Sequence, residues 1–150
     1  MRLMQFRKDW TLLPLQGAND VRFGMSEREV SRRMGLEGQR DVGNTNLVYW
    51  NESAVRVDFQ PTAHFMEFCD GVGMSVQVFG IDVFKTPAAE LIAKLVSLGH
   101  EYDADEPELG YCYTFRELQL GLWRPSLPDG PDDDDGRHFA TVGIGVTGYY

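Results

Sequence analysis

The sequence predicts an α+β protein of two αβ units, each a short helix followed by antiparallel strands, with the helices packed on one face of the sheet. The first observation behind this prediction is a helix signal that occurs twice, in residues 21–35 and 82–99. The second is that alternating, β-type segments follow each copy. We therefore expect a single compact domain over residues 1–150, with pseudo-repeat units at about 20–80 and 81–150.

The first helix is expected to begin after Ser26 and to end before Gly35. Ser26 and Glu29 have the spacing of a capping box, in which a hydroxyl and an acidic side chain satisfy the first backbone N–H groups. Val30 and Met34 share one helix face. Gly35 can adopt the left-handed conformation that closes a helix. The helix is short, so it needs support from tertiary packing.

The second helix is expected to be about one turn longer. Thr86 is the predicted N-cap, and Pro87 suits the first helical position because its missing N–H has no helical partner there. Gly99 is the predicted stop. Its apolar stripe consists of Leu91, Ile92, Leu95, Val96 and Leu98.

Alternation of apolar and polar residues, bounded by turn residues, predicts the strands. Across Gly80 the apolar face switches, which indicates a β-bulge or the end of a strand. Gly143 and Gly145, inside the last strand, are expected to let another segment approach closely. We expect residues 1–20 to pack onto the body and residues 37–46 to form a loop. The predicted strands are residues 47–50, 55–60, 64–69, 74–78, 111–115, 118–124 and 139–146.

The net charge of −9 is concentrated in two segments, residues 101–108 and 129–135. Such a field repels nucleic-acid phosphates and attracts basic proteins. We therefore expect a protein partner with a basic surface and no nucleic acid, the alternative being that the two acidic loops only keep the protein soluble. The acidic residues are Glu101, Asp103, Asp105, Glu106 and Glu108 in the first loop, and Asp129, Asp132, Asp133, Asp134 and Asp135 in the second.

No pattern of catalytic or metal-binding residues accompanies this architecture. The three histidines lack metal-ligand spacing, and there is no H-E-x-x-H, C-x-x-C or G-x-S-x-G motif. In the aspartate run, Pro131 and Val142 occupy positions where a calcium loop of the EF-hand type needs acids. Cys69 and Cys112 are expected to be buried free thiols. The sequence thus predicts a protein that is not an enzyme and has no cofactor or metal.

Aromatic residues near strand ends suggest a binding surface. Trp123 and Arg124 are adjacent and belong to residue types enriched in interface hot spots. If several aromatics share the open face of the sheet, they form a protein-binding platform, the alternative being packing in the core or at its rim. A small-ligand site made of His64, Glu67 and Arg124 is a further alternative. The aromatics are Tyr49, Trp50, Trp123, Tyr149 and Tyr150; the predicted partner-binding residues are Tyr49, Trp50, Trp123, Arg124, Glu101, Asp103, Asp105, Asp132, Asp133 and Asp134.

The string from Phe23 to Val30, with Met34 and Gly35, resembles the helix signal of small bacterial modules. It looks like the repeat of β-lactamase inhibitory proteins and of small lipoproteins of the outer-membrane barrel-assembly machinery. It is also similar to the opening of immunity proteins of bacterial toxin systems. In that group, tandem copies build a concave sheet that grips another protein. The resemblance implies a protein-binding module, such as an immunity-type inhibitor.

We expect this module to be cytoplasmic. The chain has no apolar run near the ~20 residues of a membrane span, so no membrane partner is expected. Four of the first ten residues are charged, where a signal peptide needs an apolar stretch. A homodimer formed through an exposed sheet edge is compatible with these expectations. A small-ligand binder and an accessory domain remain the alternatives in function.

Overall fold

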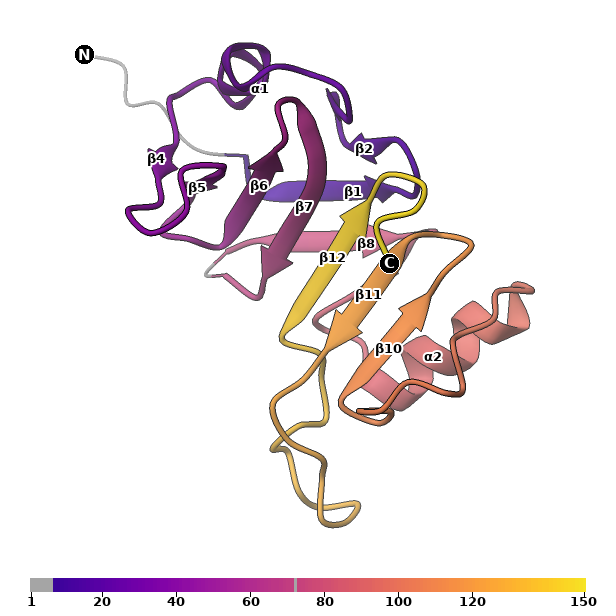
Figure 1. Ribbon diagram of the computed structural model, residues 1–150. Helices are drawn as coiled ribbons and strands as arrows, with labels where there is room; N and C mark the ends of the chain where they lie inside the picture. The colour runs from indigo at the N-terminus through magenta and orange to yellow at the C-terminus, as the bar shows by residue number, and fades with distance from the viewer. Residues whose placement is uncertain (1–6, 72) are drawn as a thin grey trace.

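The computed structural model describes residues 7–71 and 73–150, and this part of the chain forms two helices and twelve strands in two sheets. The predicted α+β class is confirmed. In Figure 1, strands of the smaller sheet cross behind those of the larger one. The larger sheet consists, in spatial order, of β10 (Cys112–Phe115), β11 (Leu120–Trp123), β12 (Thr141–Gly145), β7 (Ala63–Cys69), β6 (Val55–Phe59), β5 (Leu47–Trp50) and β4 (Gln39–Arg40).

All neighbours in this seven-stranded sheet are antiparallel. Six of its seven strands lie where alternation predicts them, with ends shifted by a few residues. The seventh, β4, lies within residues 37–46, which were expected to form a loop. Val57, Met66 and Ile144 lie side by side in register on the inner face and are buried, whereas the residues between them along each strand face outward. The sheet therefore has one apolar face and one mixed face.

The smaller sheet was not expected. It arises because Trp10 and Leu12, both 1% exposed, point inward from a segment that the sequence suggested would only pack onto the body. The side chain of Asn19 supports this segment by accepting a hydrogen bond from Thr11 N (2.8 Å) and donating one to Asp9 O (2.9 Å). In spatial order this sheet contains β3 (Val21–Arg22), β2 (Gly17–Ala18), β1 (Asp9–Leu13), β8 (Ser75–Val78) and β9 (Ile81–Asp82).

Strands β1 and β8 pair in parallel although more than sixty residues separate them, and the other pairs of the smaller sheet are antiparallel. Strand β8 ends before Phe79 and Gly80, both at positive φ, so the face switch predicted at Gly80 is a strand end. The division expected near residue 80 falls in this turn, and both sheets contain strands from either side of it.

Helix α1 (Glu27–Met34) begins and ends as predicted. The hydroxyl of Ser26 accepts a hydrogen bond from Glu29 N at 3.2 Å, and Gly35 has a φ of 81°. The Glu29 carboxylate does not complete the capping box, because it pairs with Arg32 and Arg33 on its own helix.

Helix α2 (Ala88–Ser97) follows Pro87, and no side chain caps it, so the prediction that Thr86 is the N-cap is wrong. The backbone N–H of Ala88 instead donates to the carbonyl oxygen of Arg137, at 2.7 Å. A distant loop thus supplies the acceptor that a local hydroxyl was expected to provide. Of the predicted stripe, Val96 and Leu98 are exposed: Val96 lies in the last turn of the helix, outside its buried face, and Leu98 lies just past its end.

One cluster of buried side chains lies between the two sheets and the helices. The ring of Trp10 on β1 lies 5.3 Å from that of Phe68 on β7, which joins the sheets directly. Leu91 and Leu95 of α2 add to the same cluster. The core is therefore sheet on sheet as well as helix on sheet. No helix in residues 7–71 and 73–150 is long and apolar enough to cross a membrane.

Candidate protein-binding site

Strand pairing brings the second acidic segment and the last residue of the first, Glu108, to one end of the seven-stranded sheet. Cys112, at the start of β10, pairs with Trp123 at the end of β11, and Trp123 pairs with Thr141 at the start of β12. The chain that leads into β10 and the loop between β11 and β12 therefore leave the sheet at the same end, which is the lower end in Figure 1. The two acidic loops are distant in the sequence, and the antiparallel register brings the end of the first close to the second.

Arg124 links these two loops. Its Nε donates to the carbonyl oxygen of Gly110 at 2.8 Å, and its Nη1 donates to that of Gly136 at 2.9 Å. Its guanidinium also lies 5.7 Å from the centre of the Phe139 ring. With 9% of its surface exposed, Arg124 holds the surface together from within and does not present its charge to a partner, which corrects its predicted role.

Exposed apolar side chains gather around this link. Each is between 38% and 42% exposed. Trp123 is the one the sequence predicted as a binding residue. Leu109 and Leu127 lie in loops, where no periodicity marks them, and Tyr111 precedes β10 although it was expected to belong to a strand. They are Leu109, Tyr111, Trp123 and Leu127.

Two grooves lie on either side of Tyr111 and Pro125, which line both. The first, of about 390 Å³, is called the Trp123 groove, and the second, of about 660 Å³, the aspartate groove. The Trp123 groove is lined by Pro107, Glu108, Leu109, Tyr111, Trp123, Arg124 and Pro125. The aspartate groove is lined by Tyr111, Pro125, Ser126, Leu127, Pro128, Asp129, Asp133 and Asp135.

The second acidic loop is held in shape by one of its own carboxylates. Asp133 accepts hydrogen bonds from the backbone N–H groups of Asp129 (2.8 Å) and Asp135 (2.9 Å). These bonds lower the pKa of the Asp133 carboxyl, so it stays ionised at neutral pH. Asp134 lies 3.3 Å from Arg137, and Asp132 is exposed in the same loop. The loop presents a fixed group of negative charges.

The first acidic loop is spread along the edge of β10. Asp103 lies toward the far end of that strand, where its backbone N–H donates to Thr114 and its carboxylate pairs with Arg116 at 2.9 Å. Hydrogen bonds from the backbone N–H of Asp105 and from the Arg116 side chain lower the pKa of the Asp103 carboxyl. Glu101 and Asp103 are thus remote from the grooves. Glu108 lies on the wall of the Trp123 groove, although it was not among the predicted partner-binding residues.

Two of the predicted aromatic residues do not belong to this surface. Trp50 is 2% exposed on the inner face of the sheet, and its indole N–H donates to Leu36 O at 3.1 Å, so it is a core residue. Tyr49 lies on the outer face opposite Arg56, and four strand-to-strand steps separate β5 from β11. The expected platform of Tyr49, Trp50 and Trp123 is therefore not formed.

The glycines of β12 do receive another segment, as expected, and it comes from the same chain. Residues 146–150, here called the tyrosine segment, fold back over the outer face, where Tyr149 stacks on Phe65 with ring centres 4.2 Å apart. Tyr150 packs against Gly121 and Gly143, and its backbone N–H donates to Gln119 Oε1 at 2.7 Å. Burial raises the pKa of the Tyr150 phenol well above its usual value.

The alternative small-ligand residues are not brought together. Glu67 pairs with Arg56 at 3.0 Å, and His64 Nδ1 lies 3.0 Å from the carbonyl oxygen of Asp58, both on the outer face. Arg124 lies at the end of the sheet, where its guanidinium donates to the carbonyl oxygens of Gly110 and Gly136. The three side chains therefore share no cavity wall that could hold one small molecule.

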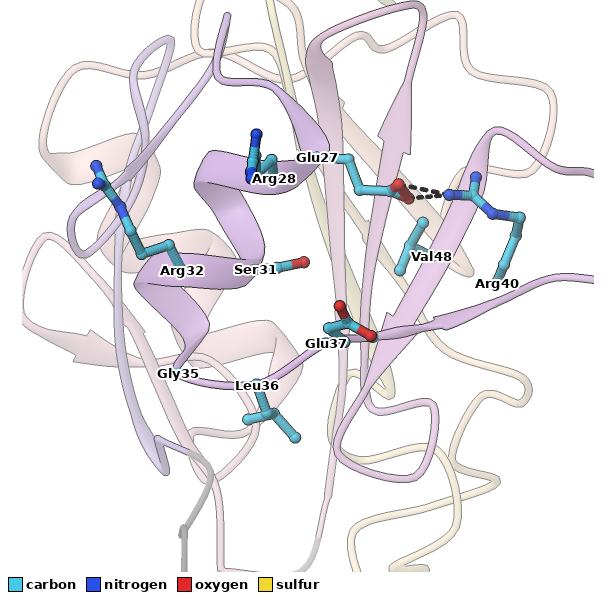
Figure 2. A pocket seen from close by; sticks show the side chains of 10 residues that line it. Glu27, Arg28, Ser31, Arg32, Gly35, Leu36, Glu37, Arg40 and Val48 are labelled. Atoms are coloured by element: carbon cyan, nitrogen blue, oxygen red, sulfur yellow. Dashed lines mark hydrogen bonds and ion pairs between the residues drawn. The ribbon is translucent and has the colours of Figure 1, made fainter.

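A larger open groove, of about 780 Å³, lies between α1 and the β4–β5 edge (Figure 2). Its walls carry charges of both signs, and the ion pair between Glu27 and Arg40 spans it. Arg28 and Arg32 line the helix side. This groove lies at the opposite edge of the seven-stranded sheet from β10, and no aromatic side chain lines it.

The two cysteines are free thiols, as expected, but they are half-buried rather than buried. Desolvation and the nearby Glu108 carboxylate raise the pKa of the Cys112 thiol to about 11, so it stays protonated at neutral pH. Within residues 7–71 and 73–150, no group of three or more histidine, cysteine, aspartate or glutamate side chains is placed to hold a metal ion.

Comparison of the chain with protein-family models, with curated protein sequences and with solved structures finds no match.

Proposed function

We propose that this protein is a non-catalytic, cytoplasmic protein-binding module that acts as an immunity-type inhibitor by covering the active surface of a basic protein. The observation that carries the proposal is the meeting of the second acidic loop, and of Glu108 from the first, with four exposed apolar side chains at one end of a sheet. Apolar anchors supply affinity, and surrounding charges supply specificity and speed of association. A rigid acidic surface with apolar centres suits a basic partner such as a nuclease.

The charge distribution also supports a choice of partner class. The carboxylates of the aspartate groove repel phosphate groups, so nucleic acids and anionic membranes are unfavourable partners. A basic protein surface meets the same field favourably, and its association should weaken as salt increases.

We further propose that the chain consists of two αβ units. Helix α1 precedes β5, β6 and β7, and helix α2 precedes β10, β11 and β12. From each side toward the centre of the larger sheet, the strands follow in chain order, so that β7 and β12 meet in the middle. This matched order supports two units joined side by side, each contributing half of one binding sheet.

The test is capture of partners by the tagged protein from its own cell lysate, at low and high salt, with a charge variant beside the wild type. The variant replaces Asp129, Asp132, Asp134 and Asp135 by Asn and keeps Asp133, which shapes the loop. The matched control changes the charge equally at exposed sites elsewhere: Glu37, Glu52, Glu90 and Glu117 to Gln.

We expect a basic protein to be retained by the wild type and the control, and to be lost from the charge variant and at high salt. Addition of the purified protein should then inhibit the activity of the captured partner. Equal retention by the charge variant and the wild type would contradict the proposal, as would a captured partner whose activity is unchanged.

A further inference from the structure

We infer that the Trp123 groove binds one arginine or lysine side chain of the partner, with the aliphatic stem between Tyr111 and Trp123 and the cationic group at Glu108. This inference rests on the proposed function and specifies the chemistry of its anchor. The groove is the part of the surface where aromatic, aliphatic and acidic side chains converge within one concave wall.

The walls suit a long basic side chain. Tyr111 and Trp123, 41% and 42% exposed, present aromatic surface, and Leu109 and the two prolines add apolar surface. Cations are attracted to the faces of tryptophan and tyrosine, and arginine and lysine bury their methylene stems against such surfaces. A purely aliphatic side chain would use only the second of these interactions.

The charges of the groove favour a cation. Glu108 is exposed, and in the part of the chain that the structure describes its carboxylate accepts a weak hydrogen bond from the Cys112 thiol (3.5 Å) and pairs with no arginine, lysine or histidine. Arg124 also lines the groove, but its guanidinium is nearly buried and donates to two carbonyl oxygens. The carboxylates on the far side of Tyr111 add to the negative field.

The aspartate groove extends the same recognition. It lies beyond Tyr111 and Pro125 and carries Asp129, Asp133 and Asp135. A partner segment that crosses this ridge can place a second basic side chain there. A short dibasic stretch is therefore the chemistry that fits both grooves at once.

The experiment titrates the full chain with blocked pentapeptides of the form Gly-Gly-X-Gly-Gly, where X is arginine, lysine, citrulline or norleucine. Binding is followed by the NMR signal of the Trp123 indole N–H and by quenching of tryptophan fluorescence. Trp10 and Trp50 are 1% and 2% exposed, so a peptide at the surface affects Trp123. We expect the arginine and lysine peptides to shift the Trp123 signal and to bind about fivefold or more tightly than the citrulline and norleucine peptides.

Two variants test the assigned contacts. Glu108→Gln should weaken binding of the arginine peptide about fivefold and leave the affinity for the citrulline peptide unchanged. Glu101→Gln, its control on the same loop, should change neither affinity. Trp123→Leu should weaken binding of both peptides, which the NMR signals of the backbone of residues 107–111 can follow in this variant. Thermal unfolding of each variant checks that the fold is retained.

The outcomes separate this inference from the proposed function. Equal binding of arginine and citrulline peptides, or equal effects of Glu108→Gln and Glu101→Gln, overturns the inference. Suppose that the wild type captures a basic partner and the charge variant does not, but Glu108→Gln and Trp123→Leu capture it as well as the wild type does. The proposed function then stands, and the groove assignment is wrong. If the arginine peptide binds as described but the charge variant loses no partner, the groove assignment stands and the proposed function fails.

Discussion

The Nη1 of Arg124 lies 2.9 Å from the carbonyl oxygen of Gly136, twelve residues further along the chain. The same guanidinium holds Gly110, at the end of the other acidic segment. One nearly buried side chain therefore keeps the end of the first acidic loop beside the second, which carries the same sign of charge. Without such a link, repulsion between their carboxylates would separate them, and the two grooves would widen.

Replacing this link should destabilise the loops. Arg124→Lys keeps the charge but loses the planar group that reaches both carbonyls. We expect the free energy of unfolding to fall by about 2 kcal/mol, the size of one charged hydrogen bond. Urea unfolding measures this loss, and hydrogen exchange should accelerate at residues 108–112 and 134–138. Arg28→Lys, on the exposed side of α1, is the control and should change stability by less than about 0.5 kcal/mol. Similar losses in both variants would contradict the prediction.

A methyl group at Gly121 should disturb the tyrosine segment. A Cβ built there lies 2.5 Å from the hydroxyl of Tyr150, so the tyrosine must move. We expect Gly121→Ala to lower stability by about 1–3 kcal/mol, as overpacking does in other proteins. The same substitution should cost clearly less in a Tyr150→Ser background, because the clash is gone.

The control for this cycle is Gly130→Ala, since a Cβ at Gly130 meets no atom within 4 Å. It should leave stability nearly unchanged in both backgrounds. If the losses of stability caused by Gly121→Ala and Tyr150→Ser simply add, Tyr150 does not pack against Gly121.

The buried phenol of Tyr150 should make stability fall in alkaline solution. Burial raises the pKa of Tyr150 above its unfolded value of about 10. Above pH 10 the unfolded chain therefore binds fewer protons than the folded one, and the free energy of unfolding decreases as pH rises toward the folded pKa. Urea unfolding at pH 8, 10 and 11 should show a larger decrease for the wild type than for Tyr150→Phe. Parallel decreases would indicate an exposed, ordinary phenol.

Cys112 should react slowly with thiol reagents. Desolvation, and then Glu108, raise the pKa of Cys112 to about 11, so at pH 8 only about one thiol in a thousand is the reactive thiolate. In a Cys69→Ser background, which leaves Cys112 as the one thiol, we expect labelling far slower than that of a small free thiol. Glu108→Gln should accelerate it, and Glu101→Gln should not. Rapid labelling of Cys112 in the Cys69→Ser protein that keeps Glu108 would contradict the prediction.

Local signals allowed the sequence to predict much of the fold. The caps at Ser26 and Gly35 lie within one helix, and the alternation of residues 55–59 lies within one strand, so neighbouring residues suffice to reveal them. The smaller sheet was missed because its strands are short and its central pair, β1 and β8, joins distant parts of the chain. The cap of α2 was assigned to Thr86 for the same reason, since its acceptor is the distant Arg137 carbonyl.

The sequence by itself determined which segments are acidic, which glycines leave space in the last strand, and that Trp123 stands at a strand end. Only the tertiary structure decided that Trp50 is a core residue and that Arg124 is an internal link. It also decided that Glu108, Tyr111 and Trp123 share one groove. The physical reason is that antiparallel pairing of β10, β11 and β12 places loops from separate parts of the chain at one sheet end.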